Sequence, residues 1–124
     1  MNIKYKIILL SLILSFSIAN AQFVKKHGQL SVKGIQLVDK NQNPIVLRGV
    51  SFGWHSMWPR FYNEKAVDWL KKDFNCNIVR AAMGIESGQH AYVKEPEFSK
   101  EKIEAVIKGA IKSDIYVIID WHSH

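Results

Sequence analysis

The most informative stretch of the sequence is Ile115-Tyr116-Val117-Ile118-Ile119-Asp120-Trp121-His122-Ser123-His124. It is an apolar run, rich in β-branched residues, that changes into an acid, an indole and two imidazoles. Such a run predicts a strand that is buried on both faces, as in parallel sheets. In parallel α/β folds the residues that carry out chemistry lie at the carboxyl ends of the strands. We therefore expect a functional site to begin at this strand end.

Two strand–helix patterns precede this stretch. Residues 45–51 and 77–83 are short apolar runs, which predicts two further strands. Asn63 is a favourable N-cap for one helix and Ser99 for a second. Apolar residues repeat at helical spacing after these caps, at Val67, Leu70, Phe74, Ile103, Val106, Ile107, Ala110 and Ile111. The order strand–helix–strand–helix–strand predicts a parallel sheet covered by helices.

A β-hairpin is predicted before this pattern. Residues 29–32 and 35–39 read as short strands joined by a turn at Lys33-Gly34, and residues 40–44 are dense in turn formers. We therefore expect residues 22–124 to form one domain that opens with a hairpin and continues into the parallel sheet.

Residues 1–21 have the composition of a secretory signal peptide. Lys4 and Lys6 form a basic start, residues 7–18 are almost wholly apolar, and Ala19-Asn20-Ala21 fits the small-x-small cleavage rule. The apolar core is shorter than the roughly 20 residues that a bilayer span requires, which disfavours the alternative of an uncleaved anchor. We predict cleavage after Ala21, a secreted or periplasmic protein, and no membrane attachment after cleavage.

The charge pattern disfavours a nucleic-acid partner. The formal net charge of the sequence is +6, and loss of Lys4 and Lys6 with the leader lowers it to +4. The excess lysines are scattered among acids rather than clustered in a stripe, as nucleic-acid binding would require. The single Cys76 permits no internal disulfide, so stability must come from a core, with Cys76 expected to be buried at a helix–strand junction.

Two architectures fit the strand–helix order: an open doubly wound sheet and a (β/α)8 (TIM) barrel. No G-x-G-x-x-G follows any predicted strand, which weakens the dinucleotide-binding, doubly wound alternative. Aromatic and histidine residues gather instead after the predicted strands, as in a barrel site assembled from several strand ends.

Three motifs give the sequence a specific resemblance. Leu47-Arg48-Gly49-Val50-Ser51, Asn77-Ile78-Val79-Arg80-Ala81-Ala82-Met83 and Asp114-Ile115-Tyr116-Val117-Ile118-Ile119-Asp120-Trp121-His122 resemble the first three barrel strands of glycoside hydrolase family 5. The similarity is closest to bacterial secreted endoglucanases (cellulases), and the hairpin start Gly28-Gln29-Leu30 also looks like theirs. It covers residues 27–124, in order and at the family's spacing.

The resemblance implies a retaining β-1,4-glucanase that needs neither cofactor nor metal and that is a monomer when full length. Its acid/base and nucleophile glutamates belong after the fourth and seventh barrel strands, whereas this sequence matches only the first three βα units. Double displacement requires two carboxylates about 5–5.5 Å apart. We therefore expect residues 22–124 to be the amino-terminal part of a truncated catalytic domain, inactive alone and, with an unclosed barrel, prone to aggregate.

Arg80 is the most informative single residue. A charge inside an apolar strand is costly unless it is paired. Arg80 could form a salt bridge at a sheet edge, or its guanidinium could lie in the barrel mouth and hold a carboxylate ionised. The resemblance implies that this carboxylate is the nucleophilic glutamate, which makes Arg80 a supporting residue. Glu86, Glu95 and Glu97 match no catalytic position of the family.

Four aromatic or imidazole side chains follow the first predicted strand: Trp54, His55, Trp58 and Tyr62. They could be core residues or a platform on which the C–H faces of a sugar stack. Trp58 and His55 look similar to substrate-binding residues of the family, and Trp54 is a further candidate. Gly84 stands where many relatives have a tyrosine, so that contact is not expected here.

His122 has two interpretations. His122 and His124 form an H-x-H pair, which can bind a metal in some barrel hydrolases, although there the motif follows the first strand. The resemblance instead makes His122 a ligand of a sugar hydroxyl, and it assigns no role to His124; His90 is also without one. The sequence is also compatible with a mannanase or another β-glycanase on the same barrel, and with a non-catalytic carbohydrate-binding fragment.

Overall fold

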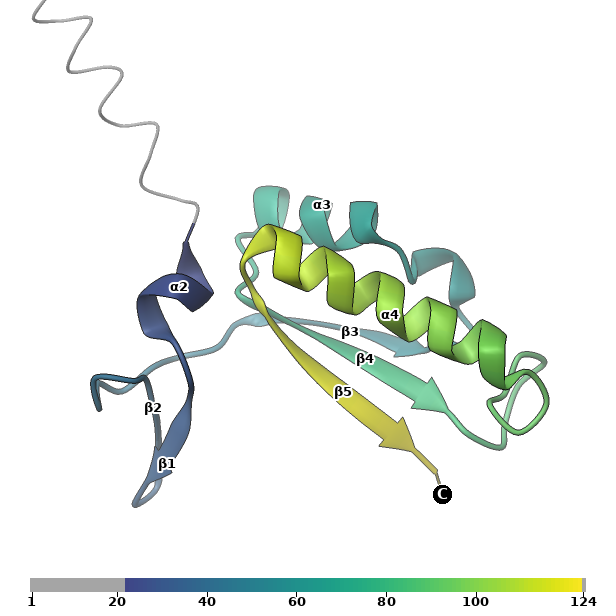
Figure 1. Ribbon diagram of the computed structural model, residues 1–124, viewed down its shortest axis with the longest axis horizontal. Coiled ribbons are helices and arrows are strands. Elements are labelled where there is room, and N and C mark those ends of the chain that lie inside the picture. Colours follow the sequence, from purple (N-terminus) through teal and green to yellow (C-terminus); the bar gives the residue numbers. More distant parts are fainter. Residues whose placement is uncertain (1–21, 124) are drawn as a thin grey trace, which may run out of the picture.

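The computed structural model describes residues 22–123 (Figure 1). The predicted signal peptide, residues 1–21, and His124 lie outside the described residues. Among the described residues no helix has the length and hydropathy needed to cross a bilayer.

The amino-terminal arm consists of helix α2 (Phe23–His27) and a hairpin of strands β1 (Ser31–Lys33) and β2 (Gln36–Val38). The hairpin is antiparallel, as predicted, and Gly34 turns it with φ +60. The buried Asp39 organises the following turn, because its carboxylate accepts the N–H groups of Asn41 and Asn43 at 2.9 and 3.0 Å. Helix α2 was not predicted: it is five residues long and buries no side chain, so it leaves no periodic signal.

Three parallel strands form the main sheet, in the order β3 (Gly49–Trp54), β4 (Ile78–Gly84) and β5 (Tyr116–His122). This order confirms the predicted parallel sheet. Strand β3 begins at Gly49 and not at the predicted residue 45, because the Ile45 N–H bonds to the carbonyl oxygen of Leu37 in the hairpin, at 3.0 Å, and not to the main sheet. The described residues contain two strand–helix units and the strand of a third, rather than three complete units.

Both helices cover the same face of this sheet (Figure 1). Helix α3 (Glu64–Phe74) begins as predicted, with the Asn63 side chain accepting the Ala66 N–H at 2.9 Å. Helix α4 (Pro96–Ser113) begins before Ser99, so the predicted Ser99 cap was wrong. Proline suits the first turn of a helix, where an N–H has no partner anyway. Ser99 instead lies buried in that turn and donates to the carbonyl oxygen of Glu95 at 2.8 Å.

The core lies between the two helices and the sheet. Strand β4 supplies Val79, Ala81 and Met83, and the buried helix residues that meet them are Val67, Leu70, Ile103, Val106 and Ala110. The two helices pack closely at Gly109, where an added Cβ would lie 3.0 Å from Val67. Cys76 is buried between α3 and β4, as predicted, and burial raises the pKa of its thiol.

Strands β3 and β4 also approach each other closely at their start. A Cβ added to Gly49 would lie 1.7 Å from the carbonyl oxygen of Ile78, a distance that no side chain tolerates. Gly49 therefore sets how near the two strands lie where the sheet begins.

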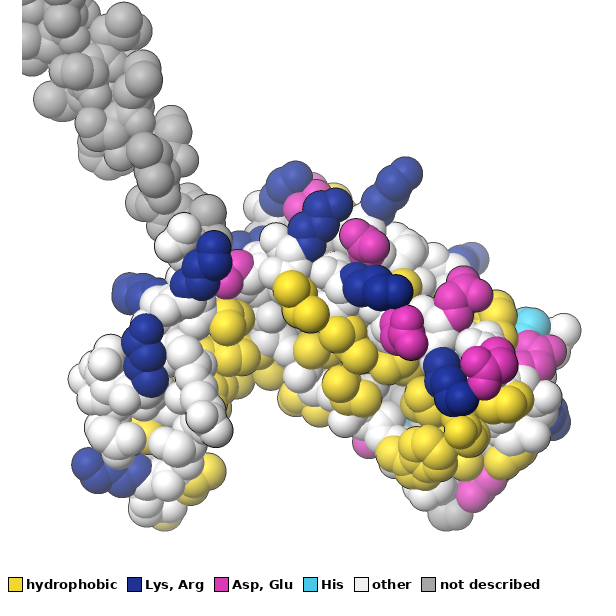
Figure 2. All heavy atoms as spheres, viewed as in Figure 1, with side chains coloured by type: hydrophobic (Ala, Val, Ile, Leu, Met, Phe, Trp, Pro, Cys, Tyr) yellow, Lys and Arg dark blue, Asp and Glu magenta, His cyan; other side chains and the backbone are white. Residues whose placement is uncertain are grey.

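Figure 2 shows basic and acidic side chains interleaved over the helices, and apolar side chains exposed beside them. Several of the charges form exposed pairs one helical turn apart, such as Lys72 with Asp68 and Lys108 with Glu104. The exposed large apolar residues of α4 and β5 are Ile111, Ile118, Ile119 and Trp121. Exposed β-branched residues on a strand indicate a sheet that needs further covering.

Candidate functional site

Strand alternation divides the sheet into two faces. On β4, Val79, Ala81 and Met83 point to the helices, so Arg80 points to the opposite face, which we term the open face. The register pairs Arg80 with Ser51 of β3, and it pairs Gly84 with His122 of β5. Polar side chains from three neighbouring strands therefore meet on the open face, toward the carboxyl ends of the strands.

Arg80 is bonded at both ends of its guanidinium. Its Nη1 donates to the Ser51 hydroxyl at 3.0 Å, and its Nη2 donates to Oδ2 of Asp120. The side chains of Arg80 and Asp120 are 32% and 26% exposed, so this pair is reached by solvent. The sequence predicted that a glutamate outside the matched strands would lie beside Arg80. Within the described residues, the carboxylate that Arg80 bonds is that of Asp120, which lies on the same face of β5 as His122.

His122 belongs to the same cluster. Its Nδ1 lies 2.9 Å from Asp120 Oδ2 and 3.1 Å from Arg80 Nη2. The ring of Trp54 packs against it, with ring centroids 5.0 Å apart. Desolvation acts to raise the pKa of Asp120, but the hydrogen bonds from His122 and Arg80 outweigh it and lower that pKa below its ordinary value.

Trp54 reaches the open face because β3 is irregular there. The register with β4 shifts between Ser51 and Trp54, which is a β-bulge. Tyr62 packs at this bulge. Its buried hydroxyl accepts the Ala82 N–H at 3.0 Å and donates to the carbonyl oxygen of Gly53. Burial raises the pKa of Tyr62 to about 12. Tyr62 is therefore a core residue and not part of a sugar platform.

His55 is fully buried, with 0% of its surface exposed. Its Nδ1 accepts the Gly84 N–H at 3.1 Å, and its Nε2 lies 2.8 Å from the Ser99 hydroxyl. Both ring nitrogens are thus used to join the end of β3 to the end of β4 and to the start of α4. This arrangement leaves no edge of the ring for a sugar, which argues against the predicted substrate contact. Burial also lowers the pKa of His55.

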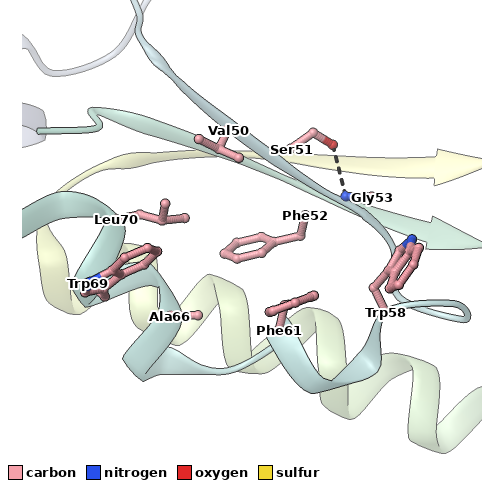
Figure 3. Close-up of a pocket in the computed structure, with 9 residues that line it drawn as sticks. All are labelled: Val50, Ser51, Phe52, Gly53, Trp58, Phe61, Ala66, Trp69 and Leu70. Atoms are coloured by element: carbon pink, nitrogen blue, oxygen red, sulfur yellow. Dashed lines mark hydrogen bonds between the residues drawn. The ribbon is translucent and has the colours of Figure 1, made fainter. Parts of the chain in front are cut away.

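The Trp58 backbone N–H donates to the Trp54 carbonyl oxygen at 3.0 Å, but its side chain lines a surface that Trp54 and His122 do not line. It lines a groove of about 520 Å³ between β3 and α3, together with Val50, Ser51, Phe52, Gly53, Phe61, Ala66, Trp69 and Leu70 (Figure 3). Trp58 is 49% exposed, and it limits the space beside Gly53, where an added Cβ would lie 3.0 Å from the indole. None of the other three candidate sugar-binding residues lines this groove.

The loop between β4 and α4 contains a further histidine, His90. Its Nδ1 pairs with Glu95 at 2.7 Å, and Lys94 donates to the Gly88 carbonyl at 3.1 Å. Both bonds join residues of the loop to one another. Tyr92 of the same loop packs edge-on against Trp121 of β5, with ring centroids 4.9 Å apart.

Within residues 22–123 no group of three or more His, Cys, Asp or Glu side chains is arranged to hold a metal ion. A metal site that joins His122 to His124 would involve a residue outside this range.

The open face combines a fixed cation, an ionised carboxylate, an imidazole and an indole. Such a set can hydrogen-bond the hydroxyl groups of a polyol and stack on its C–H surface. Asp120 is the only acid in β3, β4 and β5, and it already bonds Arg80 and His122. The three strands therefore hold no pair of carboxylates for a double displacement.

Comparisons with known proteins agree on one family. Residues 38–124 match the model of the cellulase family, glycosyl hydrolase family 5. An endoglucanase from Clostridium saccharobutylicum is 40% identical over 95 residues, which cover 77% of this chain and 21% of that protein.

Two solved structures have the same arrangement. A protein from Cytophaga hutchinsonii is 43% identical, with a TM-score of 0.79 over 83% of this chain and 33% of that one. The catalytic domain of a Thermobifida fusca endoglucanase, solved with cellotetraose, is 30% identical, with a TM-score of 0.73 over 82% of this chain and 32% of that one. This chain thus spans about a fifth of the curated relative and a third of each solved chain.

Proposed function

Because this chain belongs to the cellulase family, glycosyl hydrolase family 5, we propose that it is part of an enzyme that hydrolyses β-1,4-glucosidic bonds in cellulose or related β-glucans. The observation that carries this proposal is the family match over residues 38–124, which include the whole cluster on the open face. The cellotetraose bound by the Thermobifida fusca relative supports the substrate class.

The reaction that we propose is a retaining double displacement. One carboxylate attacks the anomeric carbon while a second protonates the leaving oxygen, and the glycosyl–enzyme intermediate is then hydrolysed. We assign both carboxylates to glutamates outside residues 22–123, because the single acid of the described strands is already bonded by Arg80 and His122.

In this scheme the described residues bind and orient the sugar. Trp54 and His122 contact the sugar beside the cleaved bond, as an indole surface and a hydroxyl ligand that pack on each other. The positive charge of Arg80 stabilises the ionised form of the nucleophile. Trp58 serves a separate position along the substrate, because it lies in the groove beside β3. We assign no sugar contact to the buried His55.

We further propose that β3, β4 and β5 are the first three strands of a (β/α)8 barrel. Both outer strands have an unpaired edge in the described sheet, and β5 exposes Ile118 and Ile119. Residues 22–124 alone should therefore aggregate or remain molten. We propose export by cleavage after Ala21, and a monomeric full-length enzyme.

The test compares the purified full-length protein with residues 22–124 for release of reducing ends from carboxymethyl-cellulose and from β-mannan. We expect turnover of carboxymethyl-cellulose by the full-length protein alone. Preference for β-mannan would favour a mannanase, and binding without turnover would favour a carbohydrate-binding module. Turnover by residues 22–124 would contradict the assignment of both glutamates to other parts of the protein.

A further inference from the structure

We propose that Asp120 is a positioning residue that holds Arg80 and His122 as one unit and fixes the tautomer of His122. In the neutral imidazole this leaves the proton on Nδ1 and makes Nε2 a hydrogen-bond acceptor. The part of the proposal that concerns the sugar rests on the proposed function, whereas the tautomer does not.

The geometry at one oxygen carries this inference. Oδ2 of Asp120 receives Arg80 Nη2 and also lies 2.9 Å from His122 Nδ1. An ionised carboxylate can only accept hydrogen bonds, so the proton of that second bond must be on Nδ1. Arg80 has no acceptor atom, and an Nδ1 that carries a proton cannot accept from it. The 3.1 Å approach of Arg80 Nη2 to His122 Nδ1 is therefore a contact between two donors that share Asp120.

The register of β4 and β5 brings these three groups together. In the register Asp120 lies beside Ala82, and Arg80 lies beside Ile118, so Arg80 reaches Asp120 diagonally across the two strands. Ser51 holds the other end of the guanidinium through Nη1 at 3.0 Å. A guanidinium held at two ends, against an imidazole held by the same acid, is preorganised before any ligand arrives.

The lowered pKa of Asp120 agrees with this arrangement, because it keeps the carboxylate ionised and accepting. Under the proposed function, an Nε2 acceptor on His122 receives a hydroxyl proton of the sugar, while the Trp54 ring packs on the imidazole. A histidine of the opposite tautomer would present a donor to the same hydroxyl group.

The direct test is nitrogen NMR of the full-length protein labelled with 15N-histidine, at a pH where imidazoles are neutral. His122 is assigned by its loss in His122→Gln. We expect the Nδ1–H pattern for His122 in the unmodified protein. A predominant Nε2–H pattern in this protein would by itself overturn the proposal. In Asp120→Ala we expect the Nδ1–H population to fall, whereas Asp68→Ala, which removes an exposed acid paired with Lys72, should leave it unchanged. An unchanged tautomer in a folded Asp120→Ala would also contradict it.

Kinetics with cello-oligosaccharides then test the consequence for the reaction. We expect Asp120→Ala to lower kcat/KM by about 10- to 100-fold, the usual effect of losing a group that orients a neighbour. Asp120→Asn, which keeps the shape and one acceptor oxygen, should recover part of this loss. If the unmodified protein hydrolyses no β-glucan, the proposed function fails while the NMR result still decides the role of Asp120. If it is active and Asp120→Ala retains full kcat/KM, the positioning role fails.

Discussion

The two faces of the β3–β4–β5 sheet are built by alternate residues of the same strands, yet they differ in almost every property. On the covered face Val79, Ala81 and Met83 are buried against two helices. On the open face Arg80 and Asp120 remain partly exposed and hydrogen-bonded. Parallel strands are ordinarily apolar on both sides. In this sheet only the covered face is packed against helices, and the open face carries the hydrogen-bonded pair of Arg80 and Asp120.

This separation has an energetic reason. Each Å² of apolar surface removed from water contributes roughly 25 cal/mol, so the covered face stabilises the fold in proportion to its area. A partly exposed ion pair such as Arg80 with Asp120 contributes little net stability, roughly 0–1 kcal/mol. Substitutions on the covered face should consequently change the free energy of unfolding, and those on the open face should change activity.

The largest effect is expected on the covered face. Ile103→Ala leaves a cavity under the sheet and should lower the free energy of unfolding by about 2–5 kcal/mol. Urea denaturation of the full-length protein measures it. Glu104→Ala, one residue away but in an exposed pair with Lys108, is the control and should change stability by less than about 0.5 kcal/mol. Equal effects of the two substitutions would contradict the role of buried contacts on the covered face in stability.

On the open face, Arg80→Met should lower kcat/KM on carboxymethyl-cellulose by about 100-fold, because a preorganised donor near the reacting groups is lost. The melting temperature should change little, since the guanidinium is partly exposed and Asp120 keeps its bond to His122. Arg48→Met, at an exposed position before β3, should leave both quantities unchanged. A large loss of stability in Arg80→Met would instead give Arg80 a structural role.

His55, which joins the end of β4 to the start of α4, makes stability depend on pH. Burial lowers its pKa, so the unfolded chain binds a proton near pH 6.5 that the folded chain resists. Its contribution is therefore complete above pH 6.5 and is lost as the pH falls through the lower pKa of the folded state. His55→Leu should cost about 1–3 kcal/mol at neutral pH, because the Gly84 N–H loses its acceptor. Denaturation between pH 4 and 8 measures both effects, and an unchanged acid slope in His55→Leu would assign the slope to other groups.

The smallest effect concerns Trp58. Trp58→Ala should alter stability by less than about 1 kcal/mol, because the side chain is half exposed. Calorimetric titration with cello-oligosaccharides should show weaker binding if Trp58 contacts substrate. Phe74→Ala, at an exposed aromatic residue that does not line this groove, is the matched control. Equal binding by the unmodified protein and Trp58→Ala would restrict sugar contacts to the open face.

The strand order and helix α3 were predictable because they depend on local signals. Apolar runs identified three strands, and the Asn63 cap identified the start of α3. The start of α4 was predicted incorrectly. Ser99 has the residue type of an N-cap, but the helix begins at Pro96, and proline is favoured in a first turn. Local patterns are reliable where the determining contacts lie within one helical turn.

The cluster was predicted only in part, because its contacts cross between strands. Arg80 and His122 were identified by type and position, but their common partner Asp120 depends on register. His55 and Trp58 have the residue types of sugar ligands. His55, however, is buried, and Trp58 lines a groove that His122 does not line. Composition does not reveal which aromatic side chains share a face when a β-bulge intervenes.

The amino-terminal arm has a consequence for the order in which the chain folds. Its bonds to the end of α4 and to β5 join residues that are far apart in sequence: the Val24 N–H donates to Asp114 across 90 residues, and the Tyr116 hydroxyl donates to Gly28 across 88. Contacts of such separation form late, because the entropy of closing a long loop must be overcome first. The amino-terminal arm is therefore expected to dock late among residues 22–123, after β5 has been synthesised, although it precedes the sheet in the sequence.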